Sequence, residues 1–550
     1  MFFRRPARHQ LFALDHAADA QALGIGRPTS KTDTGWRIFF LNALLTHAAS
    51  IANPMRTVYT QIMGATSEGT KRFHERHRQA HDVKYAVAAN MLGRTGWSIS
   101  PVGFGGYRVN DHEPAHADAL KLALRMGCNL IDTSTNYTDG GSERLVGRIL
   151  AEQFASGALN RDEIVVVSKA GYVQGENMTL AVERARKGQP FPEMVEYNEN
   201  CWHCISPEFL AEQLTRSLAR LRLQQLDVFL LHNPEYFLKT APDHAEYYRR
   251  LKQAFAYLET EVKKGRIQYY GISSNTFPEA KEADDYTSLE TVWELALSHE
   301  LGPQNHFAVI QFPLNLFESG AAFEENNTGR TVAALALDKK LGTLVNRPLN
   351  AFTDNRMIRL ADFPAHVGEG VSDRFRAAMT RTTDLESRYK GKAIVPTQQI
   401  AWGHVLKENF GRLAEVTRWK EILEYQILPT RDNALAVLAT NGFSDWCSEY
   451  RSASEELFAA FTALLESETA IQSKGIAARL DRAAPALSTS STLSRKAIRV
   501  YRSIPGINCV LVGMRRPEYV QDAMTLEPAL SAREAIEAFK NTTDGGIFDT

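Results

Sequence analysis

The chain has 550 residues, of which 44% are hydrophobic and 23% are charged. This composition is ordinary for a globular protein with a large core, and the length predicts either several domains or one large barrel with additions. The formal net charge of −1 gives no reason to expect nucleic-acid binding. Five cysteines, sparse and odd in number, argue against a disulfide scaffold and fit a reducing compartment.

The first residues, MFFRRPARHQLFAL, contain basic side chains and no acid before Asp15. Such a start is typical of an organelle-targeting peptide, but a flexible extension or an over-long gene model explains it as well, and we favour these. The apolar stretch 38–52 is too short for a membrane span and is interrupted by polar residues, so we expect a core or amphipathic helix there. The predicted protein is cytoplasmic and spans no membrane, with an organelle as the alternative location.

From residue 91 the pattern becomes regular. A hairpin is predicted over 91–100, and eight short apolar runs then alternate with stretches of helical period. The runs predicted as strands are 101–106, 129–134, 163–169, 226–232, 267–274, 307–312, 342–349 and 507–513. The predicted helices are 113–126, 141–155, 207–222, 245–264, 285–300, 329–340 and 492–503. Eight strands alternating with helices favour an α/β fold, a closed parallel (β/α)₈ TIM barrel, over a doubly wound open sheet.

A long interval separates the seventh predicted strand from its return helix. It contains two amphipathic stretches, 397–426 and 452–472, and we interpret it as a helical insertion on the catalytic face, where its role is a lid or an oligomer contact. A smaller insertion, 170–205, follows the third strand. The predicted organisation is an N-terminal extension, a barrel in two segments, the helical insertion and a C-terminal tail, at 1–88, 89–351 with 491–530, 352–490 and 531–550.

Ionisable residues end three of the predicted strands. Asp132 ends the second strand, with Tyr137 in the following loop, while Lys169 and His232 end the third and fourth. In such a barrel the carboxyl ends of the strands face one pocket, so we expect these four side chains to converge. Each of them alone has a structural explanation, such as a loop cap, a rim charge or a core hydrogen bond. All four at strand ends favour a functional site.

The chemistry of these four residues is coherent. A free phenol has a pKa of about 10, and a buried ammonium beside it favours the phenolate, so we expect Lys169 to lower the pKa of Tyr137. Asp132 supplies the counter-charge that keeps the lysine charged. His232 can hydrogen-bond a carbonyl oxygen and orient it. The set predicts acid–base chemistry on a polar carbonyl, without a nucleophile and without a metal.

The sequence CWHC at 201–204 raises the possibility of a metal site. No second cluster completes four ligands, so ordinary thiols are the favoured interpretation. The glycines of GFGG at 103–106 lack the spacing of a phosphate-binding loop.

The order of the motifs resembles the aldo-keto reductase family over about 91–350 and 492–525. The motifs are LGRTGWSISPVGFGGYR, NLIDTSTNY followed by TDGGSERLVG, VVVSKAG, SLARLRLQQLDVFLLHNPE, KKGRIQYYGISS, VIQFPLN and IPGINCVLVGMRRPEYVQD. The catalytic tetrad of that family falls on Asp132, Tyr137, Lys169 and His232. The resemblance implies NADP(H)-dependent interconversion of a carbonyl and an alcohol, in which hydride passes from the nicotinamide and Tyr137 protonates the oxygen.

The resemblance also implies a set of cofactor-binding positions, some of which depart from the family pattern. Ser274 stands where the family has asparagine, with Asn275 next to it, and Asn346-Arg347 replaces the family's Tyr-Ser in the seventh strand. Arg515 or Arg516 suits the 2′-phosphate of the adenosine, which favours NADPH over NADH although NAD(H) remains possible. The implied positions are Gly105, Gly106, Tyr107, Ser273, Ser274, Gln311, Asn346, Arg347, Pro348, Leu349, Gly513, Arg515, Arg516, Tyr519 and Asp522.

The preferred prediction is therefore an aldo-keto-reductase-like oxidoreductase acting on a small-molecule carbonyl or alcohol. The alternative is a regulatory protein that keeps the barrel and cofactor site but senses redox state for a partner. The long insertion favours this alternative, and the complete tetrad argues against it. Aldehyde, ketone and sugar substrates, the reaction direction and the oligomeric state are left open by the sequence.

Overall fold

The computed structural model describes residues 64–80, 89–298, 305–353, 356–363, 370–390, 394–413 and 415–543. The expected targeting peptide and the apolar stretch 38–52 lie outside these residues. In the described part of the chain, no helix is both long and apolar enough to cross a membrane.

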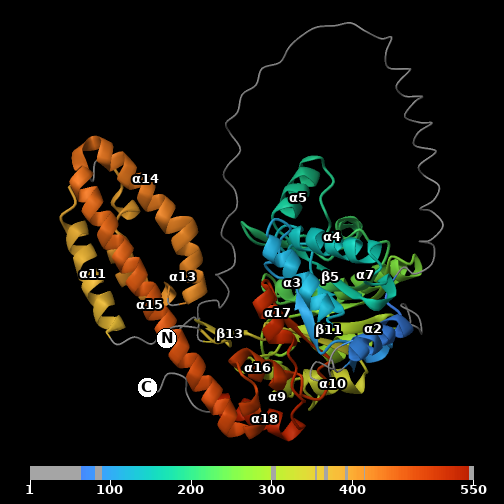
Figure 1. Ribbon diagram of the computed structural model, residues 1–550. Coiled ribbons are helices and arrows are strands. Elements are labelled where there is room, and N and C mark those ends of the chain that lie inside the picture. The colour runs from blue at the N-terminus through green and yellow to red at the C-terminus, as the bar shows by residue number, and fades with distance from the viewer. Residues whose placement is uncertain are drawn as a thin grey trace, which may run out of the picture.

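The closed parallel barrel is confirmed. Eight strands close in the cyclic order β3, β4, β5, β9, β10, β11, β12 and β15 (Figure 1), and neighbouring strands run parallel. Each predicted run overlaps one of them. The bounds are β3 Val102–Gly105, β4 Leu130–Asp132, β5 Val165–Ala170, β9 Leu226–His232, β10 Ile267–Ser273, β11 Phe307–Pro313, β12 Gly342–Asn346 and β15 Cys509–Val512.

The seven predicted barrel helices are also present. They are α3 Pro114–Arg125, α4 Gly141–Ala155, α6 Pro207–Leu221, α7 His244–Lys263, α8 Leu289–Ala296, α10 Val332–Asp338 and α16 Leu493–Tyr501. Helix α6 begins as its sequence predicts, because the Ser206 hydroxyl accepts the N–H of Phe209 and Pro207 occupies the first turn. Three further helices are α9 Gly320–Phe323, α17 Pro517–Met524 and α18 Ala532–Thr543, the last of which lies in the predicted tail.

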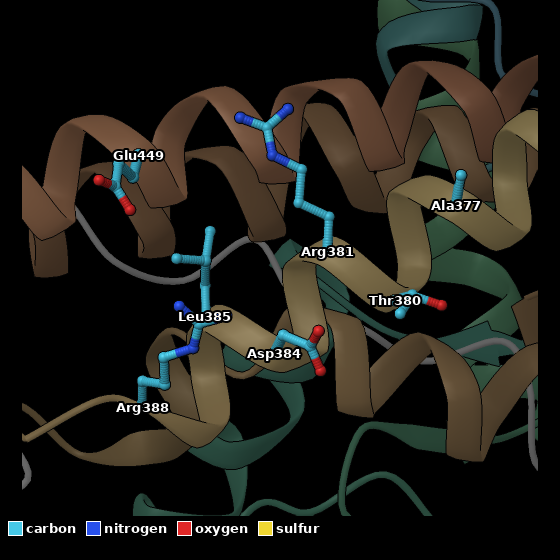
Figure 2. Close-up of a pocket in the computed structure, with 7 residues that line it drawn as sticks. All are labelled: Ala377, Thr380, Arg381, Asp384, Leu385, Arg388 and Glu449. Atoms are coloured by element: carbon cyan, nitrogen blue, oxygen red, sulfur yellow. The ribbon is translucent and has the colours of Figure 1, made fainter.

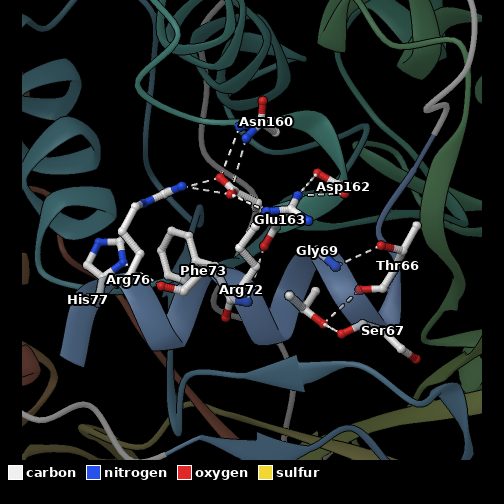
Figure 3. Close-up of polar contacts among 12 residues, drawn as sticks. Thr66, Ser67, Gly69, Arg72, Phe73, Arg76, His77, Asn160, Asp162 and Glu163 are labelled. Carbon is white, nitrogen blue, oxygen red and sulfur yellow. Dashed lines mark hydrogen bonds and ion pairs between the residues drawn. The ribbon is translucent and has the colours of Figure 1, made fainter. Parts of the chain in front are cut away.

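The amino end of the barrel is covered by a hairpin and a helix. Strands β1 (Asn90–Met91) and β2 (Ser98–Ile99) form the predicted hairpin, and helix α2 (Ser67–Ala80) belongs to the segment that the sequence assigns to an extension. Figure 3 shows Arg72 of α2 directed at Asp162, at 2.8 Å, and Arg76 directed at Glu163, at 2.7 Å. Because both carboxylates are buried, these ion pairs fasten α2 to the loop before β5.

The insertion after β12 is helical, as predicted, and has its own apolar core. It starts with a hairpin of β13 (Asn350–Thr353) and β14 (Arg356–Arg359), which the sequence pattern did not indicate. The helical segments are α11 Val371–Ser387, α12 Trp402–Leu413, α13 Val416–Ile422, the π-helical η6 Leu423–Ile427, α14 Leu428–Leu438 and the 40-residue α15 Ser444–Ala483. Figure 1 shows α11, α13 and α14 alongside α15, whose last turns approach α18 next to the barrel.

The insertion is joined to the barrel near the carboxyl ends of the strands. Arg108, in the loop after β3, pairs with Glu421 of α13 at 2.8 Å. Within the insertion itself, Ser473 of α15 donates a hydrogen bond to the carbonyl of Ala361, just after β14, at 3.0 Å. The insertion therefore contacts the face of the barrel on which the candidate site lies.

The smaller insertion after β5 is a three-stranded antiparallel sheet with one helix. Its elements are β6 Tyr172–Val173, α5 Glu176–Arg186, β7 Val195–Asn198 and β8 Cys201–His203. The thiols of Cys201 and Cys204 are buried and free, and burial raises the pKa of each to about 11. His203 instead contacts the backbone carbonyl of His232 through Nε2 at 2.7 Å. Among the described residues, no group of three or more His, Cys, Asp or Glu side chains is placed to hold a metal.

Candidate active site

The strands direct their last side chains into the barrel by simple alternation. An apolar cluster contains alternate residues of β4, β5 and β9, namely Leu130, Val165, Val167, Val228 and Leu230. Successive side chains of a strand point to opposite faces, so the residue two positions further on points the same way as the clustered one. Asp132, Lys169 and His232 stand at those positions. The period-two pattern thus places all three at the carboxyl end of the barrel interior.

A buried ion pair lies at the centre of the site. The Lys169 ammonium is 2.6 Å from both carboxylate oxygens of Asp132, and the lysine side chain is fully buried. Burial lowers the pKa of Lys169, and attraction to Asp132 opposes this effect. The Gln311 amide also donates to Asp132 at 2.8 Å, and its oxygen accepts from Ser273 at 3.0 Å. Strands β4, β5, β10 and β11 are therefore connected by one polar network.

Tyr137 joins this group through its ring. The ring centroid lies 4.9 Å from the Lys169 ammonium, 5.8 Å from the His232 ring and 5.4 Å from the Tyr107 ring. The expected lowering of the phenol's pKa is wrong for this structure. Burial, assisted by the charge of Asp132 and by Tyr107, raises the pKa of Tyr137 well above 10. The Lys169 ammonium lies over the ring and binds Asp132, and its attraction for the phenolate does not outweigh the burial of the phenol.

His232 is held as a neutral imidazole. Its Nδ1 lies 3.0 Å from the Ser134 hydroxyl, which leaves Nε2 for a further contact. Burial, and then the charges of Lys169 and His203, place the pKa of His232 well below 6.5. The ring of Tyr172, from β6, packs edge-on against His232 with centroids 4.7 Å apart.

Gly105, the last residue of β3, and Gly106, which follows it, stand where neighbouring protein atoms leave no room for a side chain. A Cβ on Gly106 would lie 2.6 Å from the Ser142 hydroxyl and 2.7 Å from the Asp132 carbonyl, which are forbidden distances. A Cβ on Gly105 would lie 3.1 Å from the carbonyl of Val512. The residue after them, Tyr107, is half exposed beside Tyr137.

The predicted cofactor positions at the ends of β10 and β12 differ in whether their polar groups are already engaged. The N–H of Ser274 donates to the Gln311 carbonyl at 2.9 Å, which keeps its turn against β11. The side-chain oxygen of Asn346 is buried without a hydrogen-bond partner. The next residue, Arg347, has a left-handed backbone with φ of 52° and pairs with Glu318 at 2.9 Å, so its guanidinium is already engaged. Pro348 and Leu349 continue from it into the insertion.

The predicted phosphate-binding positions follow β15. A Cβ on Gly513 would meet open space, and Arg516 is the N-cap of α17. Neither Arg515 nor Arg516 forms an ion pair within the described chain, and burial together with the nearby Arg108 lowers the pKa of Arg515. Tyr519 is 46% exposed.

Asp522 is used differently from the expectation. Its carboxylate accepts from the hydroxyls of Thr492, at 2.7 Å, and Ser494, at the start of α16. It therefore holds Thr492, the N-cap residue of the helix that follows the insertion.

Four polar residues close to the tetrad were not singled out from the sequence: Ser134, Asn136, Tyr172 and Glu235. The first two stand two and four residues after Asp132, and the last stands three residues after His232, so proximity to a strand end was the available signal. Tyr172 stands three residues after Lys169, so the same signal applied to it, and the β6–β8 sheet holds its ring against His232.

A separate hollow lies on the insertion, between α11 and α15, away from the strand ends. It measures about 730 Å³. Figure 2 shows two arginines and two acids on its walls, without any residue of the tetrad. The lining residues are Ala377, Thr380, Arg381, Asp384, Leu385, Arg388 and Glu449.

The comparisons with known proteins agree with this arrangement. The model of the aldo/keto reductase family matches residues 101–339, from the first barrel strand to the helix before β12. The chain is 25% identical over 226 residues to an NADH-specific methylglyoxal reductase of Escherichia coli, which is 38% of this chain and 61% of that protein. It is 27% identical over 204 residues to a 6-dehydroglucose reductase of Novosphingobium aromaticivorans, which is 36% of this chain and 54% of that protein.

Among solved structures, aldo-keto reductase AKR11C1 of Bacillus halodurans in its holo form aligns with a TM-score of 0.43 and 14% identity, covering 83% of this chain and 96% of that one. The structural class of the protein is a closed (β/α)₈ barrel with a polar site of Asp, Tyr, Lys and His side chains at the carboxyl ends of its strands. The chain resembles the aldo-keto reductase family over residues 101–339. It spans 54–61% of the length of the two curated relatives described above.

Proposed function

We propose that the protein is an NADP(H)-dependent oxidoreductase that interconverts an alcohol with an aldehyde, ketone or sugar carbonyl, with Tyr137 as the proton donor. One observation carries the proposal. A charged lysine, neutralised by Asp132 at 2.6 Å, lies under the ring of a protonated tyrosine beside a neutral histidine, at the carboxyl end of the barrel.

The residues at this end fit a dinucleotide. The buried oxygen of Asn346 has no hydrogen-bond partner in the described structure and can accept a bond from a bound group. Ser273 and Gln311 offer amide and hydroxyl groups to a carboxamide, although in the described structure they bind each other. Arg515 and Arg516 can hold the adenosine 2′-phosphate. When bound, NADPH would supply the hydride.

The protein side of the reaction follows from the pKa directions. Because the pKa of Tyr137 is raised, its phenol keeps its proton at neutral pH and can donate it from Oη to a carbonyl oxygen. As the proton leaves, negative charge develops on Oη, and the Lys169 ammonium is the nearby cation that stabilises it. The Nδ1 of His232 is engaged by Ser134, so Nε2 is left to position the oxygen.

A second candidate function is a cofactor-binding redox sensor. The observation in its favour is the large insertion, which has its own core and contacts the loop after β3 through the Arg108–Glu421 pair. A sensor needs the cofactor site and has no need of a proton donor, so loss of Tyr137 would leave its function unchanged.

Titration of the purified protein with NADPH and NADH, followed by tryptophan fluorescence, tests the proposal. We expect tight NADPH binding, weaker NADH binding, and turnover of at least one aldehyde or sugar that Tyr137→Phe abolishes. Failure to bind either cofactor would refute the proposed activity. Tight binding with the same slow turnover in the wild type and in Tyr137→Phe would favour the sensor.

A further inference from the structure

A buried carboxyl group lies directly behind the proposed nicotinamide-binding turn. Glu235 is the middle residue of the short helix η4 (Pro234–Tyr236), three positions after His232, and is 1% exposed. Its Oε1 accepts the backbone N–H of Asn275 at 2.9 Å. The N–H of Asn233 donates to the Ser273 carbonyl at 2.7 Å, so the two strand ends are held together. Glu235 therefore contacts the turn 273–275 through the backbone of Asn275.

This carboxyl group is only half satisfied. Its Oε2 is buried without a hydrogen-bond partner. The nearest cation is Lys239, whose ammonium pairs with Asp285 at 3.5 Å and lies over the Tyr236 ring at 5.1 Å. A structural acceptor for one N–H does not require a charge, because glutamine or water would serve. The Oε2 of Glu235, which has no hydrogen-bond partner in the described chain, is therefore free to interact with a positively charged group.

Four ionisable groups face Glu235. They are Lys239 on the following turn, Tyr236 on its own helix, Tyr172 of β6 and Tyr247 of α7. Burial raises the pKa of all three phenols, so they stay neutral. Burial also raises the pKa of Glu235 to about 7, with Lys239 opposing the effect. The carboxyl thus changes charge between pH 6 and pH 8 while the three phenols do not.

We propose that Glu235 is a positioning residue whose negative charge makes the 273–275 turn bind oxidised, positively charged nicotinamide better than reduced, neutral nicotinamide. This inference rests on the proposed function, because it assumes that a nicotinamide cofactor binds at this turn. The oxidised ring carries a formal positive charge and the reduced ring carries none. A buried carboxylate close to it distinguishes the two forms, whereas the Lys169–Asp132 pair is neutral overall and does not.

The test is the ratio of the affinities for NADP⁺ and NADPH, measured at pH 6 and pH 8 by fluorescence titration. The 2′-phosphate titrates in both forms and cancels in the ratio. In the wild type, we expect the preference for NADP⁺ to rise about fivefold or more from pH 6 to pH 8, as Glu235 becomes charged. In Glu235→Gln, which can still accept the Asn275 N–H, the ratio should stay at its low-pH value throughout.

Glu259→Gln is the matched control. Glu259 is also a buried carboxylate that accepts a backbone N–H, from His306 at 2.7 Å, but it lies at the amino end of β11. This variant should keep the pH-dependent ratio of the wild type.

Three results would overturn the inference. One is a wild-type ratio that does not change with pH. Another is a ratio in Glu235→Gln that changes as in the wild type. The third is equal weakening of both forms by Glu235→Gln, which would make Glu235 a structural anchor only. If the wild type binds neither cofactor form, the proposed function itself fails, and this outcome is distinct from the others.

Discussion

Replacing Asp132 by asparagine should destabilise the protein strongly, because it strands a buried ammonium. The two charges are 2.6 Å apart and the lysine side chain is fully buried. With an effective dielectric constant of about 20, their attraction is roughly 6 kcal/mol, and desolvation of each ion costs several kcal/mol. The intact pair is therefore worth little net, but removal of one partner should cost about 3–5 kcal/mol. The midpoint of urea-induced unfolding of the barrel should therefore move to a lower urea concentration.

The double variant Asp132→Asn, Lys169→Met separates this argument from simple loss of contacts. Removal of both charges should recover at least about 2 kcal/mol relative to the sum of the single effects. In Asp132→Asn alone, the loss should shrink as the pH is raised toward 9, because the buried lysine can then lose its proton at less cost. We would follow urea unfolding by near-UV circular dichroism. Additive effects, or a single-variant loss below about 1 kcal/mol, would refute the reasoning.

Three other predictions follow from the same geometry. In Tyr137→Phe, turnover should fall at least about 100-fold while the NADPH dissociation constant stays within twofold, since the phenol acts in proton transfer only. Arg515→Ala and Arg516→Ala, made singly, should weaken NADPH binding about tenfold in at least one case and leave NADH binding unchanged. In Arg76→Ala, the buried Glu163 loses its two hydrogen bonds from Arg76 and keeps only Arg72 as a cation, at 3.4 Å, so the free energy of unfolding should fall by about 1.5–3 kcal/mol at pH 7. Arginine variants that weaken NADH binding and leave NADPH binding unchanged would contradict the second prediction. An unfolding free energy of Arg76→Ala equal to that of the wild type would contradict the third.

The barrel could be predicted because each strand is a short apolar run whose burial imposes period two. The same alternation that buries Val165 and Val167 sets the direction of Lys169. A correct strand assignment therefore also predicted that the side chains at the strand ends point into the barrel. The pKa of Tyr137 could not be predicted in this way. Its direction depends first on how completely the folded chain buries the phenol, and the loop after β4 that places Tyr137 has no periodic pattern that shows this burial.

The insertion shows where sequence reasoning lost information. Amphipathic period identified the region of α12 and α13 and the middle of α15, because those helices bury one face against each other. Helix α11 and the hairpin of β13 and β14 were missed. The hairpin strands are only four residues long, which is too short for a periodic signal.

The helix α2 has a clear role in the fold, although its sequence was assigned to an extension. Eight of its fourteen residues are Lys, Arg, Glu or His, so composition alone is typical of a solvated segment. Helix α2 is held in place by the part of the barrel that it contacts, where the buried carboxylates of Asp162 and Glu163 lie just before β5. A charged helix with two arginines four residues apart meets two adjacent acids. Such complementarity between segments about 90 residues apart appears only when the chain is folded, and it places α2 at the barrel end opposite the tetrad.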